Sequence, residues 1–203
     1  VITDPKILEE FSKDHSFVKP TKPFCVVFPQ NKEEVKQIIR LANEYKVPLT
    51  PISSGPPHFR GDTIPREGGI IINLSKMKRI LRIDTRNRTI MIEPGVTFGE
   101  LVPHLEKNGL RLNMPFLPRA SKSVVTSYLE REPPIIPKYQ FDYVDPLLTM
   151  EVVFGTGDEF RTGTASGPGS IEEMQCDMVN PFGPGDIKYF KLLSGAQGTL
   201  GIV

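Results

Sequence analysis

The sequence predicts an α+β fold of two lobes, a small parallel α/β lobe over residues 1–74 and a larger lobe over residues 75–203. Three observations lead to this prediction. Apolar runs in the order strand, helix, strand fill the first lobe, which is typical of a βαβ unit with parallel pairing and a right-handed crossover. Short strands joined by polar turns follow, which is typical of an antiparallel sheet. Helices with recognisable caps flank these strands.

The first lobe is predicted to hold two helices and three strands: helices over 4–11 and 31–46, and strands over 25–28, 47–52 and 68–74. Asp4 is a good N-cap, with Pro5 at the first helical position. Asn31 caps the second helix, NKEEVKQIIRLANEYK, whose apolar residues recur on one face. The last strand, GGIIINL, is apolar throughout, so we expect it to be buried on both faces.

The second lobe is predicted to hold strands over 79–84, 89–93, 147–154 and 159–162, and helices over 97–109 and 186–193. The polar turn TRNR joins the first two strands as a hairpin, and GTGD joins the next two. Thr97 and Glu100 have the spacing of a capping box. Residues 117–145 contain four prolines and little periodicity, which indicates either a long functional loop or a wrong assignment of its elements. The final GIV predicts the start of a buried strand, in a fragment or in a sheet that a partner chain completes.

The composition excludes several classes of protein. There are 25 lysines and arginines against 24 aspartates and glutamates, so a net charge of +1 gives no electrostatic basis for a nucleic-acid partner. No apolar run approaches the ~20 residues that span a bilayer. The N-terminus is acidic rather than signal-like, so we expect a cytoplasmic protein. Two cysteines cannot build a disulfide framework, and three separated histidines show no metal-ligand spacing.

The common nucleotide and hydrolase motifs are absent, and small-residue loops remain. There is no G-x-G-x-x-G after a strand, no G-x-x-x-x-G-K-[ST] and no G-x-S-x-G. The loops cover residues 53–62, 93–95, 121–127 and 195–201. Glycine and serine after a strand can present the converging backbone N–H groups that a diphosphate requires. Each loop taken alone is also compatible with an ordinary turn.

Four landmarks occur in a fixed order: NKEEVKQIIRLANEYKVPLTPISSG, GGIIINLSKM, IEPGVTFGEL and GAQGTLGIV. Together they resemble the FAD-binding domain of the vanillyl-alcohol oxidase and p-cresol methylhydroxylase superfamily (PCMH-type). The branch they resemble most is that of the flavin-linked glycolate and lactate dehydrogenases. The resemblance covers almost the whole chain, and it implies an FAD held in an elongated form between the two lobes.

The resemblance also implies which residues hold FAD. The pyrophosphate loop corresponds to Ser53, Ser54, Gly55, Pro56, Pro57, His58, Gly61 and Asp62. Gly95 corresponds to the position that backs the cofactor. The segment that lines the flavin ring corresponds to Pro118, Ser121, Ser123, Val124, Thr126 and Ser127, and the closing contact near the adenine corresponds to Gly198 and Ile202.

The chain departs from the family pattern at three places. The pyrophosphate loop reads SGPP instead of a glycine run, and prolines donate no N–H, so the donors must come from Gly55, His58 or beyond. Pro57 stands where some members carry the histidine that bonds to the flavin, so we expect non-covalent FAD.

The flavin-lining loop is bulkier than in the family. Tyr128, Arg131, Lys138 and Tyr139 could reach the ring or a substrate, or belong to a surface excursion. The substrate-binding cap of the family is not represented, so no catalytic residue is assigned.

The resemblance implies an oxidoreductase in which FAD takes a hydride from an alcohol or a 2-hydroxy acid and passes electrons to an external acceptor. A cap domain or a partner subunit would complete the substrate site. Two other interpretations stay open. The chain could be a flavin-carrying electron-transfer or assembly subunit without substrate chemistry, or a domain that has kept the fold and lost the cofactor.

Overall fold

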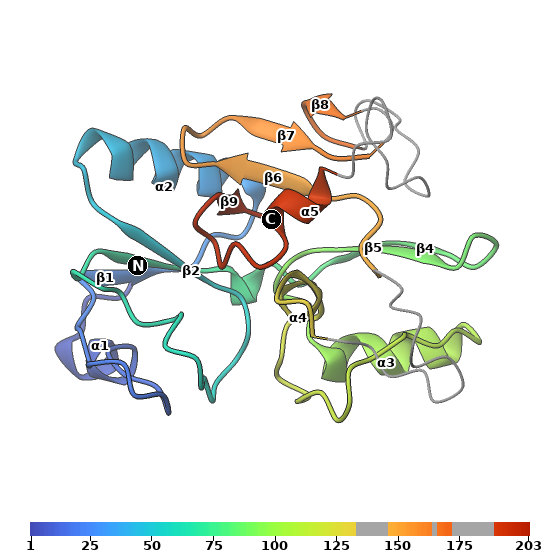
Figure 1. Cartoon of the computed structure of the whole chain (residues 1–203), viewed down its shortest axis with the longest axis horizontal. Coiled ribbons are helices and arrows are strands. Elements are labelled where there is room, and N and C mark those ends of the chain that lie inside the picture. The colour runs from blue at the N-terminus through green and yellow to red at the C-terminus, as the bar shows by residue number, and fades with distance from the viewer. Residues whose placement is uncertain (133–145, 164–165, 172–188) are drawn as a thin grey trace.

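The computed structural model describes residues 1–132, 146–163, 166–171 and 189–203 (Figure 1). Its elements are α1 (Pro5–Glu10), β1 (Cys25–Val27), α2 (Lys32–Glu44), β2 (Leu49–Ile52), β3 (Ile70–Asn73), the 3-10 turn η1 (Leu74–Lys76), β4 (Ile80–Asp84), β5 (Thr89–Ile92), α3 (Phe98–Lys107), α4 (Val124–Leu129), β6 (Glu151–Phe154), β7 (Glu159–Arg161), β8 (Gly167–Pro168), α5 (Phe190–Leu193) and β9 (Gly201–Ile202). The predicted α+β class, with one parallel sheet and separate antiparallel strands, is confirmed.

The first sheet has the order β1-β3-β2, and all its pairs are parallel. The parallel pairing is as predicted, but β3 lies between the two strands that α2 connects. Alternation along β3 buries its two faces separately. Ile72 packs under α2 in a cluster with Val35 and Ile39, whereas Ile71 packs on the opposite side with Leu8 of α1. The strand is therefore buried on both faces, as its apolar sequence predicts.

The hairpin β4–β5 is antiparallel and lies beside α3 (Figure 1). Side chains of α3 form a second core cluster with α4, which includes Phe98, Leu101, Val124 and Tyr128. The predicted capping box holds, because Thr97 and Glu100 exchange the expected hydrogen bonds at the start of α3.

The third sheet has the order β8-β7-β6-β9 and is antiparallel throughout. Adjacent residues of β6 pack into different hydrophobic clusters. Val153 packs into the α2 cluster, and Val152 packs with Phe190 of α5. The third sheet is therefore fixed against the helix of the first one, which brings the C-terminal segment close to the end of β2.

Some elements differ from expectation. Helix α4 falls where the sequence predicts a loop, and its N-cap is Ser123, whose side chain accepts from the N–H of Thr126. The strand β9 forms where GIV predicts one, but Ile202 is only partly buried. Lys138, Tyr139 and the start of the predicted helix over 186–193 lie outside the described residues. Within the part of the chain that the structure describes, no helix is long and apolar enough to cross a bilayer.

Candidate functional site

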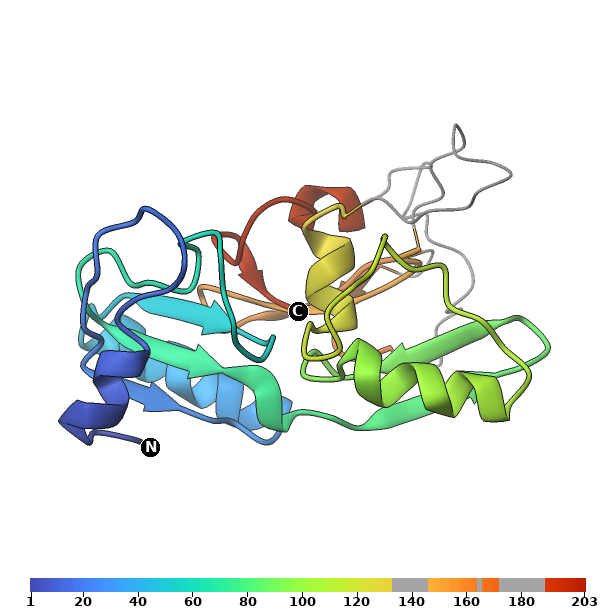
Figure 2. The same ribbon diagram turned by 90° about the horizontal axis from the view of Figure 1, so that it is seen from below.

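Three segments that are far apart in the sequence enclose one cavity of about 570 Å³. They are the loop after β2 (residues 53–63), the segment over residues 115–132 that includes α4, and the C-terminal turn (residues 193–203). The turn is fixed to α4 by a hydrogen bond of 2.6 Å from the amide of Gly195 to the carbonyl of Leu129. Figure 2 shows α4 beside this turn and next to the parallel sheet. Eight of the residues proposed from the sequence line the cavity: Ser53, Ser54, His58, Asp62, Pro118, Thr126, Gly198 and Ile202.

Backbone contacts join the first two segments into one wall. The amide of Gly55 donates to the carbonyl of Ser121 at 2.8 Å, and the Ser121 hydroxyl donates to the carbonyl of Pro56 at 3.1 Å. The amide of Ser123 donates to the hydroxyl of Ser54 at 3.0 Å. The side chain of Arg119 also donates to the carbonyl of Pro57. The first half of the loop after β2 is therefore held against the start of α4.

The remaining nine proposed residues do not line the cavity: Gly55, Pro56, Pro57, Gly61, Gly95, Ser121, Ser123, Val124 and Ser127. Gly95 shows why. A Cβ there would meet the carbonyl oxygens of Leu74 at 2.5 Å and Met77 at 2.6 Å, so this glycine permits a close approach of the chain to itself. Its neighbour Pro94 lines the cavity instead.

Between Gly55 and Gly61, the free backbone donors of the loop after β2 lie at its tip, residues 58–60. The amide of Gly55 is used by Ser121, and the amide of Gly61 donates to the carboxylate of Asp14 at 2.7 Å. Between them, the amides of His58, Phe59 and Arg60 donate to no acceptor within the described residues. All three residues line the cavity, so these amides are available to an anion. Ser54, Asp62 and Thr63 also line it, and their amides likewise donate to no acceptor within the described residues.

Hydroxyl groups line the same cavity. The hydroxyls of Ser53 and Thr126 are hydrogen-bonded to each other across the wall, and both residues line the cavity. His58 is partly buried, and burial lowers the pKa of its imidazole, with the positive charge of Arg119 as a second cause. The imidazole is therefore neutral at pH 7 and can serve as a hydrogen-bond donor and acceptor.

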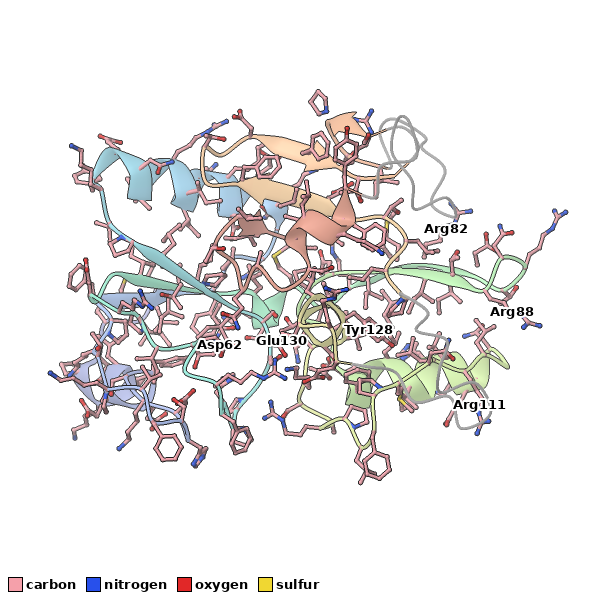
Figure 3. The ribbon with its side chains drawn as sticks, viewed as in Figure 1. Asp62, Arg82, Arg88, Arg111, Tyr128 and Glu130 are labelled. Carbon is pink, nitrogen blue, oxygen red and sulfur yellow. The ribbon has the colours of Figure 1, made fainter. Side chains whose placement is uncertain are left out.

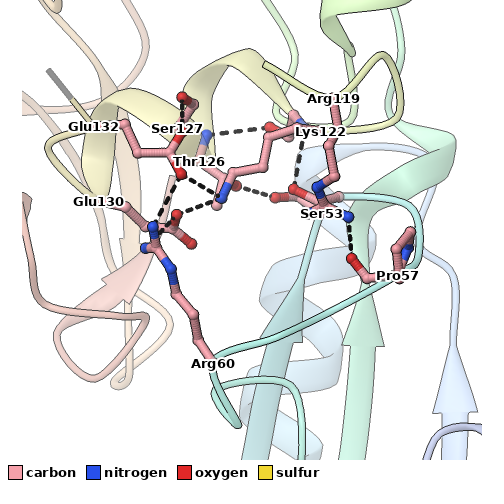
Figure 4. Close-up of polar contacts among 11 residues, drawn as sticks. Ser53, Pro57, Arg60, Arg119, Lys122, Thr126, Ser127, Glu130 and Glu132 are labelled. Carbon is pink, nitrogen blue, oxygen red and sulfur yellow. Dashed lines mark hydrogen bonds and ion pairs between the residues drawn. The ribbon is translucent and has the colours of Figure 1, made fainter. Parts of the chain in front are cut away.

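A charged network that the sequence analysis did not anticipate lines the same cavity (Figure 4). Lys122 pairs with Glu130 and with Glu132, and Arg60 pairs with the same two carboxylates. Burial raises the pKa of Glu130. Burial acts in the same sense on Glu132, but a hydrogen bond from Ser127 and the charge of Lys122 outweigh it, so the pKa of Glu132 is lowered.

Tyr128 and Arg131 do not contribute to the cavity wall. Tyr128 is buried in the α3 cluster, and its hydroxyl donates to the carbonyl of Asn113. In Figure 3, Asp62 and Glu130 lie near the centre of the molecule, where both line the cavity, whereas Arg88 and Arg111 lie at its far end. Among the described residues, no group of three or more His, Cys, Asp or Glu side chains is placed to hold a metal ion.

Comparison with known proteins identifies the family. The family model described as FAD binding domain matches residues 23–127. The chain belongs to this FAD-binding family. It is 32% identical over 150 residues to the flavoprotein subunit of 4-cresol dehydrogenase [hydroxylating] from Pseudomonas putida, covering 73% of this chain and 28% of that protein. It is 29% identical over 195 residues to the glycolate oxidase subunit GlcD of Bacillus subtilis, covering 95% of this chain and 38% of that protein.

Solved structures agree with this assignment. The crystal structure of p-cresol methylhydroxylase with substrate bound superposes with a TM-score of 0.79 at 27% identity. The match covers 99% of this chain and 38% of that one. The chain thus spans well under half the length of these relatives. Its PCMH-type fold and its FAD cofactor follow from the family, as the sequence predicts.

The cavity has the donor set that FAD requires. Amides at the loop tip, the hydroxyls of Ser53 and Thr126, and the guanidinium of Arg119 suit a diphosphate. Apolar walls suit ring systems: Ile52, Leu74, Phe116, Val125, Leu129 and Ile202 line the rest of the cavity. Its volume lies within the usual range of ~300–1,000 Å³ for ligand pockets. The residues present therefore fit FAD.

Proposed function

We propose that this cavity holds FAD non-covalently and that the chain is the FAD-binding part of an oxidoreductase acting on an alcohol or a 2-hydroxy acid. The observation that supports this proposal most is the meeting of three separate loops around one cavity with polar donors and apolar walls. The relatives support the reaction class, since they include a 4-cresol dehydrogenase subunit and a glycolate oxidase subunit.

The roles of the residues follow from their positions. The amides at 58–60 and the hydroxyls of Ser53 and Thr126 would hold the diphosphate. The C-terminal turn at Gly198 and Ile202 would close over one end of the cofactor, and the apolar walls would exclude water from the rings. When bound, FAD accepts a hydride from a carbon donor and returns electrons one or two at a time. His58 presents a neutral imidazole to the cavity, so it adds no positive charge beside the cofactor.

Reconstitution tests the proposal. The purified chain is incubated with FAD or with FMN, desalted, and assayed for visible flavin absorbance. We expect retention of FAD in a 1:1 ratio and weaker retention of FMN, because only FAD has an adenine end for the C-terminal turn to hold. Acid precipitation should release all the flavin. A chain that stays colourless with both flavins would refute the FAD site, and flavin that stays with the acid precipitate would refute non-covalent binding.

Donor tests then address the reaction class. The FAD-loaded chain is mixed anaerobically with glycolate, D-lactate or a 4-alkylphenol, and bleaching of the flavin is followed. We expect bleaching by one of these donor classes and recovery of colour on addition of an artificial electron acceptor. Flavin that stays oxidised with all three donors, in a chain that retains FAD, would instead support a flavin-carrying role without substrate chemistry.

A further inference from the structure

The charged network joins opposite sides of the cavity. Arg60 belongs to the loop after β2, whereas Glu130 and Glu132 follow α4. One guanidinium nitrogen of Arg60 lies 2.6 Å from a carboxylate oxygen of Glu130, and another lies 2.9 Å from Glu132 (Figure 4). A guanidinium that contacts two carboxylates at once presents its planar fork in the geometry that favours strong, oriented pairing.

The two cations of this network differ in how firmly they are held. The Lys122 side chain is 9% exposed and remains on the α4 side of the cavity, next to both glutamates. The Arg60 side chain is 44% exposed and comes from the tip of a loop. Lys122 is therefore held beside both carboxylates, and Arg60 is the member that can attach to them or leave.

Charge balance indicates what the network does. Two cations face two carboxylates, so the network has no excess positive charge with which to attract a diphosphate. The amides of residues 58–60 are among the free backbone donors of the cavity lining, and they belong to the same loop tip as Arg60. The ion pairs of Arg60 therefore act on the position of this tip.

We propose that Arg60 is a positioning residue whose ion pairs with Glu130 and Glu132 hold the loop tip across the cavity and slow the release of bound FAD. This inference rests on the FAD site proposed above. Breaking the pairs frees the tip without removing any amide donor, so the cofactor still binds and leaves faster.

The test compares the unaltered chain with Arg60→Met and, as a matched control, Arg66→Met. Arg66 is exposed on the same loop region and forms no ion pair with any described residue. Each chain is loaded with FAD and diluted, and free flavin is collected by ultrafiltration over time. We expect release from Arg60→Met to be about tenfold faster, which corresponds to ~1.4 kcal/mol, and release from Arg66→Met to be unchanged. Raising the salt concentration should accelerate release from the unaltered chain but not from Arg60→Met.

A second variant separates positioning from direct contact with the cofactor. Glu132→Gln removes one partner of Arg60 and leaves Lys122 paired with Glu130. A positioning role predicts faster release from Glu132→Gln as well. Slower release would mean that Arg60, freed from a competing carboxylate, binds the diphosphate itself, and this would overturn the inference. Equal release from Arg60→Met and the unaltered chain would also overturn it, whereas a chain that takes up no FAD would refute the site as a whole.

Discussion

Gly198 is the position where a single added methyl group tests the closure of the cavity. Its φ is +78°, and a Cβ there would lie 2.3 Å from Cγ of Pro51 and 3.1 Å from its Cδ. Pro51 is in β2, and both residues line the cavity. Gly198→Ala should therefore impose backbone strain and also push the C-terminal turn away from the end of β2.

The magnitude has two parts. Placing alanine in the left-handed region costs about 1 kcal/mol. Forcing a methyl group into a filled contact costs about 1–3 kcal/mol, because proline is rigid and part of a strand. We therefore expect the free energy of unfolding to fall by about 2–4 kcal/mol.

Gly195→Ala is the matched control. Gly195 lies in the same turn with a φ of +80°, but a Cβ there would meet nothing within 4 Å, so only the strain of about 1 kcal/mol remains. Unfolding in urea and FAD affinity are measured for both variants. We expect Gly198→Ala to be the less stable and to bind FAD at least about tenfold more weakly than Gly195→Ala, a difference of ~1.4 kcal/mol. Equal stabilities and affinities would show that Pro51 gives way, and would refute the close packing of the turn against β2.

Three further changes probe the cavity wall. His58→Ala should leave the flavin as fully released by acid as in the unaltered chain, and flavin that becomes acid-releasable only in the variant would reveal a covalent bond. Because the pKa of His58 is lowered from 6.5 in the folded chain, the unfolded chain binds more protons, so stability should fall as the pH drops below ~6.5, and His58→Gln should lose less over this range. Lys122→Met should cost about 3 kcal/mol at pH 7, since it leaves buried Glu130 with Arg60 alone. This cost should shrink in acid as Glu130, whose pKa is raised, takes up a proton, and urea unfolding at several pH values measures it.

Local patterns predicted the elements whose causes are local. The helix α2 follows from the cap at Asn31, which accepts from the amide of Glu34, and from one apolar face. The hairpin β4–β5 follows from its turn residues. Helix α4 was missed because it is six residues long and begins with β-branched Val124 and Val125, which favour strands. Its signal was the N-cap at Ser123, which the resemblance had assigned to a flavin-lining loop.

Predicting the site would have required knowledge of contacts between segments that are far apart in the sequence. The resemblance located the loop after β2, but it could not reveal that the amide of Gly55 is already used by Ser121. Arg60 and Glu130 are separated by 70 residues, so their ion pair has no sequence periodicity. The sequence EREPP after α4 contains two carboxylates, Glu130 and Glu132. Buried carboxylates require nearby cations, but only the fold shows which cations are near.

The two prolines of the SGPP sequence affect which backbone groups of the loop after β2 can donate to an anion. They remove two N–H donors, and between Gly55 and Gly61 the free backbone donors that remain lie in the short arch of residues 58–60. Both ends of this arch are fixed by the N-terminal segment, because the amide of His15 donates to the carbonyl of His58 at 2.9 Å and Asp14 accepts from the amide of Gly61. The family match begins only at residue 23. Residues outside the matched region therefore hold both ends of this arch in place, and if the arch binds the diphosphate as proposed, changes in the N-terminal segment should weaken FAD binding as well.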